Sequence, residues 1–102
     1  VAGQGEPSAS IRARVVAARA RQQVRYSADR VRANAELGPA LMNRDCRLDR
    51  DGVRLLNAAV NTLALTARGY DRVRKVARTI ADLAGTESIS ADHVAEALQF
   101  RM

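Results

Sequence analysis

The chain has 102 residues, which is enough for one domain with a single modest core. Hydrophobic residues make up 47% of it but aromatic residues only 3%, so small aliphatic side chains must fill the core, which favours closely packed helices over a sheet. The net charge of +6 favours polyanionic partners such as nucleotides or nucleic acid, and no apolar run approaches the roughly 20 residues of a membrane span, so we expect no membrane partner.

The start of the chain has the character of a linker. Residues 1–7 include Gly3, Gly5 and Pro7, the first residue is Val1 rather than a methionine, and the start lacks the basic and apolar regions of a signal peptide. We expect residues 1–7 to be a linker or disordered start, and residues 8–102 to be a domain of a longer protein. The lone Cys46 excludes an internal disulfide and favours a cytoplasmic setting, and we expect it to be a small buried hydrophobe.

A first helix is predicted from about Ala9 to Ser27, with Ser8 or Ser10 as its N-cap. Four side chains recur on it at helical spacing and form a narrow stripe: Ile11, Val15, Ala18 and Gln22. Arginines border this stripe on two edges: Arg12 and Arg19 on one, and Arg14, Arg21 and Arg25 on the other. These arginines could contact DNA phosphates, but two separate edges are more typical of a solvated helix or of an interface with another domain.

The middle of the chain contains an irregular segment followed by a helix. The pair Gly38-Pro39 breaks residues 28–49, which we expect to hold only a short helix around residues 39–43. A longer helix is predicted from about Arg50 to Leu65. Its apolar residues share one face, as in a buried amphipathic helix: Val53, Leu56, Ala59, Val60 and Leu63.

The strongest periodicity lies between Ala67 and Ala84, with Thr66 as a predicted N-cap and Gly85 as a left-handed C-cap. One broad face is apolar: Tyr70, Val73, Val76, Ala77, Ile80, Leu83 and Ala84. The opposite face is polar: Arg68, Arg72, Lys75 and Thr79.

A last helix is predicted to begin after the N-cap Ser90, with Asp92 in its first turn and Val94, Ala97 and Leu98 on its buried side. No strand-like alternation occurs anywhere. The sequence therefore predicts an all-α fold, a compact bundle of about four helices.

The residues needed for catalysis are missing from the sequence. It contains no glycine-rich phosphate loop, no acidic pair for Mg²⁺ and no Ser/His/Asp set, and we predict no metal site. We expect the single histidine, His93, to be exposed in the first turn of the last helix and to have no catalytic role. The chain by itself should bind no cofactor and catalyse no reaction.

The start of the Ala67–Ala84 helix offers the most informative pattern. A capped N-terminus attracts anions through its free N–H groups, and Arg68 adds a permanently charged fork that suits phosphate oxygens. Arg72 and Lys75 extend this stripe, which could reach a phosphate that another domain supplies. The alternative is a solvated polar face, in which Asp71 pairs with Lys75 and Arg78 pairs with Asp82.

The run from Leu65 to Gly85, with Val-Ala-Arg-Thr-Ile-Ala-Asp-Leu at 76–83, closely resembles the C-terminal domain of the magnesium-chelatase-like ComM/YifB proteins. The ending, residues 89–101, is similar to the same family. So are residues 10–15, 18–22, 34–37 and 46–48, so the resemblance covers nearly the whole chain from about Ser8 to Arg101.

The resemblance implies an AAA+ ATPase core on the N-terminal side of this chain, with residues 8–102 as its helical lid. It implies ATP and Mg²⁺ as cofactors of the full-length protein, and a homo-oligomeric ring, a hexamer. Thr66-Ala67-Arg68 matches the sensor-2 position, so Arg68 would contact the terminal phosphates, in cis or in trans, with Arg72 and Lys75 beside it. ComM itself is implied to be a DNA helicase that promotes branch migration during natural transformation.

Two small departures from the family pattern leave the resemblance intact. Thr66 stands where Ser is commoner and caps nearly as well, and Gly69 stands where Ala is usual, which costs about 1 kcal/mol of helix stability.

Two alternative functions stay open. One is the chelatase motor subunit of tetrapyrrole synthesis, which helps insert Mg²⁺ into protoporphyrin, and the other is a free-standing basic DNA-binding helical module.

Overall fold

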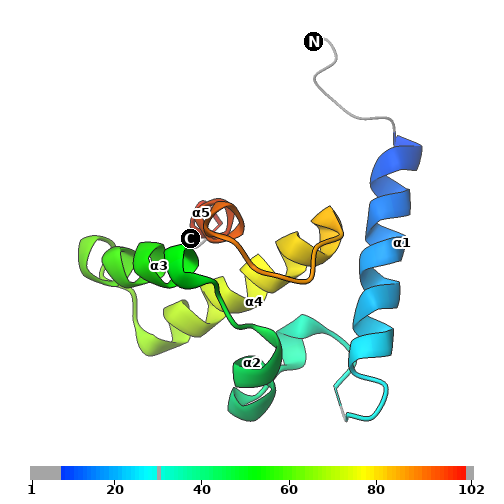
Figure 1. Ribbon diagram of the computed structural model, residues 1–102, viewed down its shortest axis with the longest axis horizontal. Coiled ribbons are helices and arrows are strands. Elements are labelled where there is room, and N and C mark those ends of the chain that lie inside the picture. The colour runs from blue at the N-terminus through cyan, green and yellow to red at the C-terminus, as the bar shows by residue number, and fades with distance from the viewer. Residues whose placement is uncertain (1–7, 30, 101–102) are drawn as a thin grey trace.

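The computed structural model describes residues 8–29 and 31–100, and within them every regular element is helical (Figure 1). The elements in chain order are α1 (Ser8–Arg25), the 3₁₀-helix η1 (Asn34–Glu36), α2 (Pro39–Asp45), α3 (Arg50–Thr62), α4 (Ala67–Ala84) and α5 (Ala91–Leu98). The all-α prediction is confirmed. The irregular segment folds into both η1 and α2, so five α-helices replace the expected four. The predicted linker at 1–7 and the family match at Arg101 lie outside the described residues.

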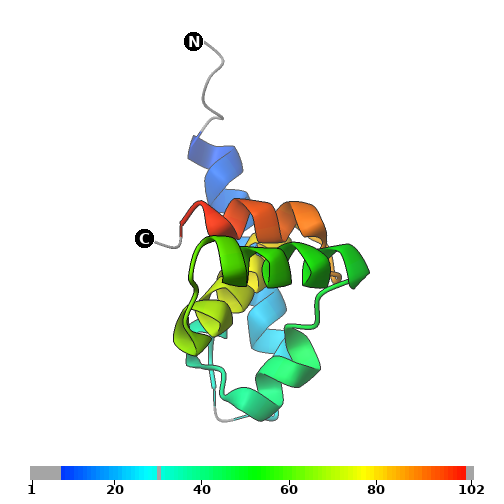
Figure 2. The same cartoon turned by 90° about the vertical axis from the view of Figure 1, so that its left-hand side faces the viewer.

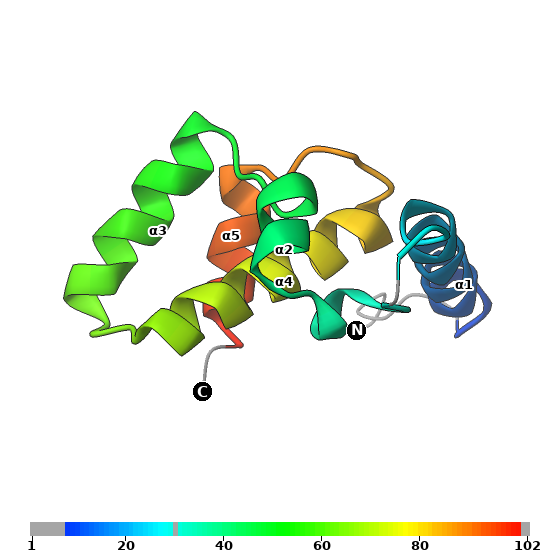
Figure 3. The ribbon, with the colours of Figure 1, turned by 90° about the horizontal axis from the view of Figure 1, so that it is seen from below.

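α4 is the central helix of the bundle (Figures 1 and 3). It contacts α5, η1 and α1, while α3 packs mainly on α5. Figure 2 shows α3 and α5 side by side, with the N-terminal half of α1 extending beyond the rest of the molecule. α1 therefore joins the bundle at one edge, against the C-terminal half of α4.

Caps fix both ends of α4 where the sequence predicts them. The Thr66 side chain accepts a hydrogen bond from the Gly69 N–H at the first turn. Gly85 ends the helix with a φ of +76°, a left-handed conformation that glycine adopts without a steric penalty. This helix therefore begins and ends at the predicted residues.

The apolar core lies between α2, α3, α4 and α5. Its fully buried centre is made of Cys46, Leu56, Ala77, Ala81, Ile89 and Val94. Burial of Cys46 is confirmed, and its desolvation raises the pKa of the thiol. α1 contributes no residue to this core cluster and buries only Ala18 and Gln22.

Two predicted apolar faces are only partly covered. Val53 of α3 and Leu63, the residue that follows α3, are 39% and 37% exposed, because α3 lies at the edge of the bundle and packs mainly on α5. Ala84, at the end of α4, is also exposed. The buried face of α4 is rotated from the predicted one and includes two charged residues, Arg78 and Asp82.

The Asp82 carboxylate is buried and binds three parts of the chain. Both nitrogens of the Arg25 fork donate to it, over 2.6 and 3.0 Å, and Asn34 Nδ2 donates to it over 2.9 Å. Arg78, one turn earlier on α4, lies 3.2 Å away. Tyr26 Oη donates to Asn34 Oδ1 over 2.5 Å. The network links α1 and η1 to α4, and it is charge-assisted and bidentate, the strongest type of side-chain hydrogen bonding.

The prediction that Arg78 and Asp82 form a solvated surface pair is therefore right about the pairing and wrong about its exposure to solvent. The pair exists, but its side chains are only 5% and 0% exposed. The physical reason is that α1 and η1 fold back over this side of α4 and cover it. Spacing along one helix contains no information about segments that lie 48 and 57 positions away.

Arginines of α4 also hold α2 in place through its backbone. Arg74 Nη2 donates to the carbonyls of Met42 and Cys46 over 3.2 and 3.3 Å, and Arg78 Nη1 donates to that of Asp45 over 3.3 Å. These carbonyls lie at the C-terminal end of α2, where a helix leaves its last acceptors unpaired and favours positive charge. The two arginines thus add side-chain donors at the C-terminal end of α2, where the Met42 carbonyl already accepts from the Cys46 N–H.

The pKa of Asp82 reflects two opposing effects. Burial alone would raise it, but the hydrogen bonds from Arg25 and Asn34 and the charges of Arg78 and Arg25 outweigh burial and hold it below its ordinary value. The carboxylate is therefore ionised in the folded protein, and its ionisation stabilises the fold.

We predict that Asp82→Ala lowers the free energy of unfolding by about 3–5 kcal/mol, because it leaves Arg25 and Arg78 as buried charges without their partner. Urea denaturation followed by circular dichroism measures the change. Asp71→Ala is the matched control, since Asp71 is exposed and its nearest cation is 3.9 Å away, and it should leave stability unchanged. Equal stability of the two variants would contradict the central role of the network.

We also predict acid sensitivity that depends on Asp82. Its folded pKa is below the unfolded value, so its stabilising contribution is complete above about pH 4 and is lost as the pH falls through the folded pKa. Urea midpoints of the wild type and Asp82→Asn should therefore differ most at pH 6 and converge toward pH 2. A difference that stays constant over this range would show that ionisation of Asp82 contributes nothing.

Candidate functional site

The first turn of α4 presents Arg68 to solvent. The Thr66 hydroxyl accepts from the Gly69 N–H over 3.0 Å, and the Thr66 carbonyl accepts from the Tyr70 N–H over 2.8 Å. This cap sharpens the start of the helix and fixes the direction in which the Arg68 side chain leaves it. The site thus stands on a rigid helix rather than on a loop.

The Arg68 side chain is exposed and makes no hydrogen bond or ion pair with any described residue of the chain. Within the described part of the chain, no residue takes up the donors of its guanidinium. By contrast, three other arginines donate hydrogen bonds inside the bundle: Arg25, Arg74 and Arg78.

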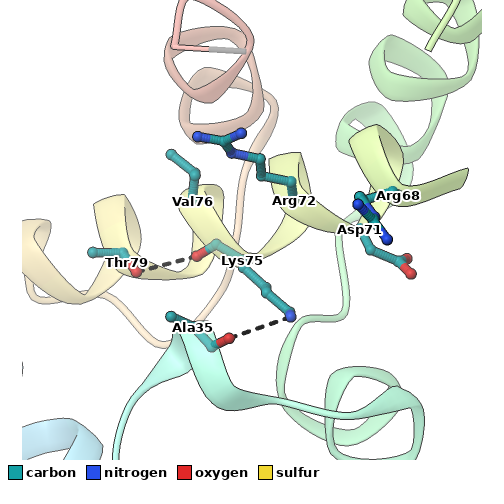
Figure 4. Close-up of a pocket in the computed structure, with 7 residues that line it drawn as sticks. All are labelled: Ala35, Arg68, Asp71, Arg72, Lys75, Val76 and Thr79. Atoms are coloured by element: carbon teal, nitrogen blue, oxygen red, sulfur yellow. Dashed lines mark hydrogen bonds between the residues drawn. The ribbon is translucent and has the colours of Figure 1, made fainter. Parts of the chain in front are cut away.

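A groove of about 580 Å³ runs along the polar face of α4 past Arg68 (Figure 4). Its walls come from α4 and from the η1 segment: Ala35, Arg68, Asp71, Arg72, Lys75, Val76 and Thr79. The three predicted site residues, Arg68, Arg72 and Lys75, thus line one groove. Thr79 closes its far end, where its hydroxyl donates to the Lys75 carbonyl over 3.1 Å.

The charged ends of these three residues diverge within the groove. Lys75 Nζ donates to the Ala35 carbonyl over 3.4 Å, across the groove from α4. The Arg72 side chain turns toward α5 in Figure 4 and also lines a smaller hollow with Ala97 and Phe100. Lys75 thus has a protein partner in the groove, whereas Arg68 and Arg72 have none among the described residues, and Arg68 is the one of these two in the first turn of α4.

The predicted ion pair of Asp71 with Lys75 is replaced by another. Asp71 lies 3.9 Å from Arg74, three residues later on the helix. Lys75 reaches instead across to the η1 segment, whose position no spacing within α4 could reveal. The contribution of Ala35 to the groove was missed for the same reason, since its role is carried by a backbone carbonyl.

His93 has a structural role that its predicted exposure did not suggest. It is partly buried, and its Nδ1 accepts from the Ser90 backbone N–H over 3.0 Å. His93 thus completes a capping box at the start of α5, in the position where Glu or Gln is usual. The spacing Ser-x-x-His was the signal that could have identified this contact.

Within residues 8–29 and 31–100, no three His, Cys, Asp or Glu side chains gather as metal ligands would. None of the helices described is both long and apolar enough to cross a membrane.

Comparison with known proteins finds a matching family for the chain. Residues 5–101 match the family described as "Magnesium chelatase, subunit ChlI C-terminal". The chain is 41% identical over 98 residues to "Competence protein ComM" of Haemophilus influenzae, which covers 96% of this chain and 18% of that protein. It is 38% identical over 100 residues to the uncharacterized protein YifB of Salmonella typhimurium, covering 98% of this chain and 19% of that protein.

The YifB protein of Escherichia coli is 36% identical over 97 residues, which cover 95% of this chain and 18% of that protein. The chain therefore spans about a fifth of the length of the curated relatives it matches. No solved structure matches it.

We predict that Thr66→Ala lowers the free energy of unfolding by about 1 kcal/mol, the typical value of an N-cap side chain. Thermal unfolding followed by circular dichroism measures the loss. Thr62→Ala is the control, because the Thr62 hydroxyl donates only to the exposed Ala58 carbonyl near the end of α3. An equal effect of both substitutions would show that the cap does not hold the start of α4.

Proposed function

The chain belongs to the family of C-terminal domains of magnesium-chelatase-like ComM and YifB proteins, and we propose that it is the helical lid of an ATP-driven AAA+ motor. The observation that carries the proposal is the Arg68 guanidinium, exposed at a capped helix start and unpaired within the described part of the chain. In this proposal the rest of the same polypeptide supplies the ATPase core, which holds ATP and Mg²⁺, and the protein acts in the cytoplasm.

Arg68 acts as the sensor of the nucleotide's terminal phosphate in this proposal. A planar, permanently charged fork suits phosphate oxygens, and the positive end of the α4 dipole adds to its attraction. Hydrolysis removes the terminal phosphate, so the lid loses a partner and rotates against the core. Arg72 and Lys75 line the same groove and add positive charge beside Arg68.

The proposed motor is a homo-oligomeric ring, a hexamer, in which Arg68 serves either its own subunit's nucleotide or a neighbour's. We propose DNA as its substrate, with branch migration as its work. The relative from Haemophilus influenzae is named a competence protein, and the net charge of +6 supports a polyanionic partner. An assay of branch migration against one of Mg²⁺ insertion into protoporphyrin separates this proposal from the chelatase alternative.

We predict that Arg68→Ala in the longer protein slows ATP hydrolysis by about 10³-fold, the effect typical of an arginine that contacts a transferring phosphoryl group. Steady-state phosphate release measures the rate. The 102-residue variant should unfold at the same temperature as the wild type, because Arg68 makes no bond within the described fold.

Arg54→Ala is the matched control, since Arg54 is an exposed arginine of α3 outside the groove. It should hydrolyse ATP at the wild-type rate. Wild-type turnover by the Arg68 variant would reject the sensor role, and tight, salt-dependent binding of duplex DNA by the 102-residue chain alone would favour a free-standing DNA-binding module instead.

A further inference from the structure

The face of α1 that points away from α4 is apolar and uncovered. Ala18 and Gln22 pack inward and are buried, whereas five aliphatic residues on the opposite side of the helix are exposed: Ala13, Val16, Ala17, Ala20 and Val24. Val16 and Val24 are 61% and 76% exposed. Figures 1 and 3 show α1 at the edge of the molecule, with no other helix on this side. We call these five residues the outer face of α1.

The spacing of the outer face is that of a helix-packing seam. Ala13, Ala17, Ala20 and Val24 follow one another at intervals of four, three and four residues, the spacing of the apolar positions of a coiled coil. Small side chains on such a seam allow a second helix to approach closely. The geometry therefore fits an α-helix better than a strand or a loop.

The charges beside the outer face specify the partner's chemistry. α1 contains five arginines and no acidic residue. Arg12 and Arg19 border the outer face on one side, Arg21 borders it on the other, and all three are exposed. In paired helices these flanking positions set partner choice through opposite charges. The complementary helix carries Asp or Glu on both sides of its apolar stripe.

Other occupants fit less well. A second copy of α1 would place five positive charges against five, which is repulsive. A phosphate backbone would leave the apolar seam uncovered, and helices that lie on a lipid surface use large residues such as Trp, Phe and Leu rather than Ala. The face consists of three alanines and two valines, which are small side chains, whereas a stable complex between separate proteins buries about 800 Å² on each partner.

A helix of the same polypeptide is the better occupant for such a face, because covalent connection supplies a high effective concentration. The chain spans 18–20% of the length of its relatives and belongs to a family described as C-terminal, and α1 is its first helix. We therefore propose that the outer face of α1 packs against an acidic-flanked helix of the ATPase part of the same protein. This inference rests on the proposed function.

Photo-crosslinking in the longer protein tests the interface. Benzoylphenylalanine replaces Ala20 or, in a second variant, Val24, and the control variant carries it at Ala58, an exposed alanine of α3. We expect crosslinks from one or both α1 positions to a helix of the ATPase part that carries acidic residues, and none to that helix from Ala58. Crosslinks to a second copy, to nucleic acid or to lipid, or none above the control, would overturn the proposal.

Charge reversal supplies an independent measurement. Arg12→Glu with Arg19→Glu should reduce the yield of the crosslink from Val24 by about tenfold, because attraction on one border of the face becomes repulsion. Replacing the facing acidic residues by Arg should restore the yield. Arg50→Glu with Arg54→Glu on α3 is the matched control and should leave the yield unchanged. A crosslink yield that does not change when the α1 charges are reversed would overturn the proposal that the partner helix is acidic.

Failure of this inference and failure of the proposed function give different results. Crosslinks to the acidic helix together with wild-type ATP turnover by Arg68→Ala would retain the docking surface and reject the sensor. Slow turnover by that variant with crosslinks elsewhere would do the opposite. A gene in which no ATPase part accompanies this chain would reject both.

Discussion

The buried carboxylate of Asp82 holds together three segments that are far apart in the sequence. It takes a bidentate bond from Arg25 at the end of α1, an amide bond from Asn34 of η1 and the charge of Arg78 on its own helix. Because α1 buries only Ala18 and Gln22 and adds no residue to the main apolar cluster, these polar contacts contribute to fixing where it lies. A buried charge that loses its partner is costly, so the segments keep one arrangement.

The bundle thus combines two kinds of cohesion. α2 to α5 share an apolar core of small aliphatic side chains, as the composition requires, whereas α1 is attached through the hydrogen bonds of Arg25 and the burial of Ala18 and Gln22. The same helix α4 takes part in both. Its N-terminal turn also carries Arg68, so the proposed phosphate contact and the attachment of α1 are built on one rigid element.

The sequence predicted what depends on local spacing, and it failed where distant segments meet. Thr66, Gly85 and Ser90 identified the ends of α4 and the start of α5, because capping is a property of neighbouring residues. The exposure of Arg68 followed from its face of the helix. The burial of Arg78 and Asp82 could not be predicted, since an i, i+4 ion pair looks the same whether or not another helix covers it.

One geometric consequence follows from the length of α4. Fourteen residues separate its first-turn arginine from Asp82, which at the rise of an α-helix is a lever arm of about 21 Å. A tilt of about 10° around the N-terminal end would carry the carboxylate by about 4 Å, more than the whole 2.6 Å length of its contact with Arg25. α1 must then move together with α4, or the ion pair between Arg25 and Asp82 breaks.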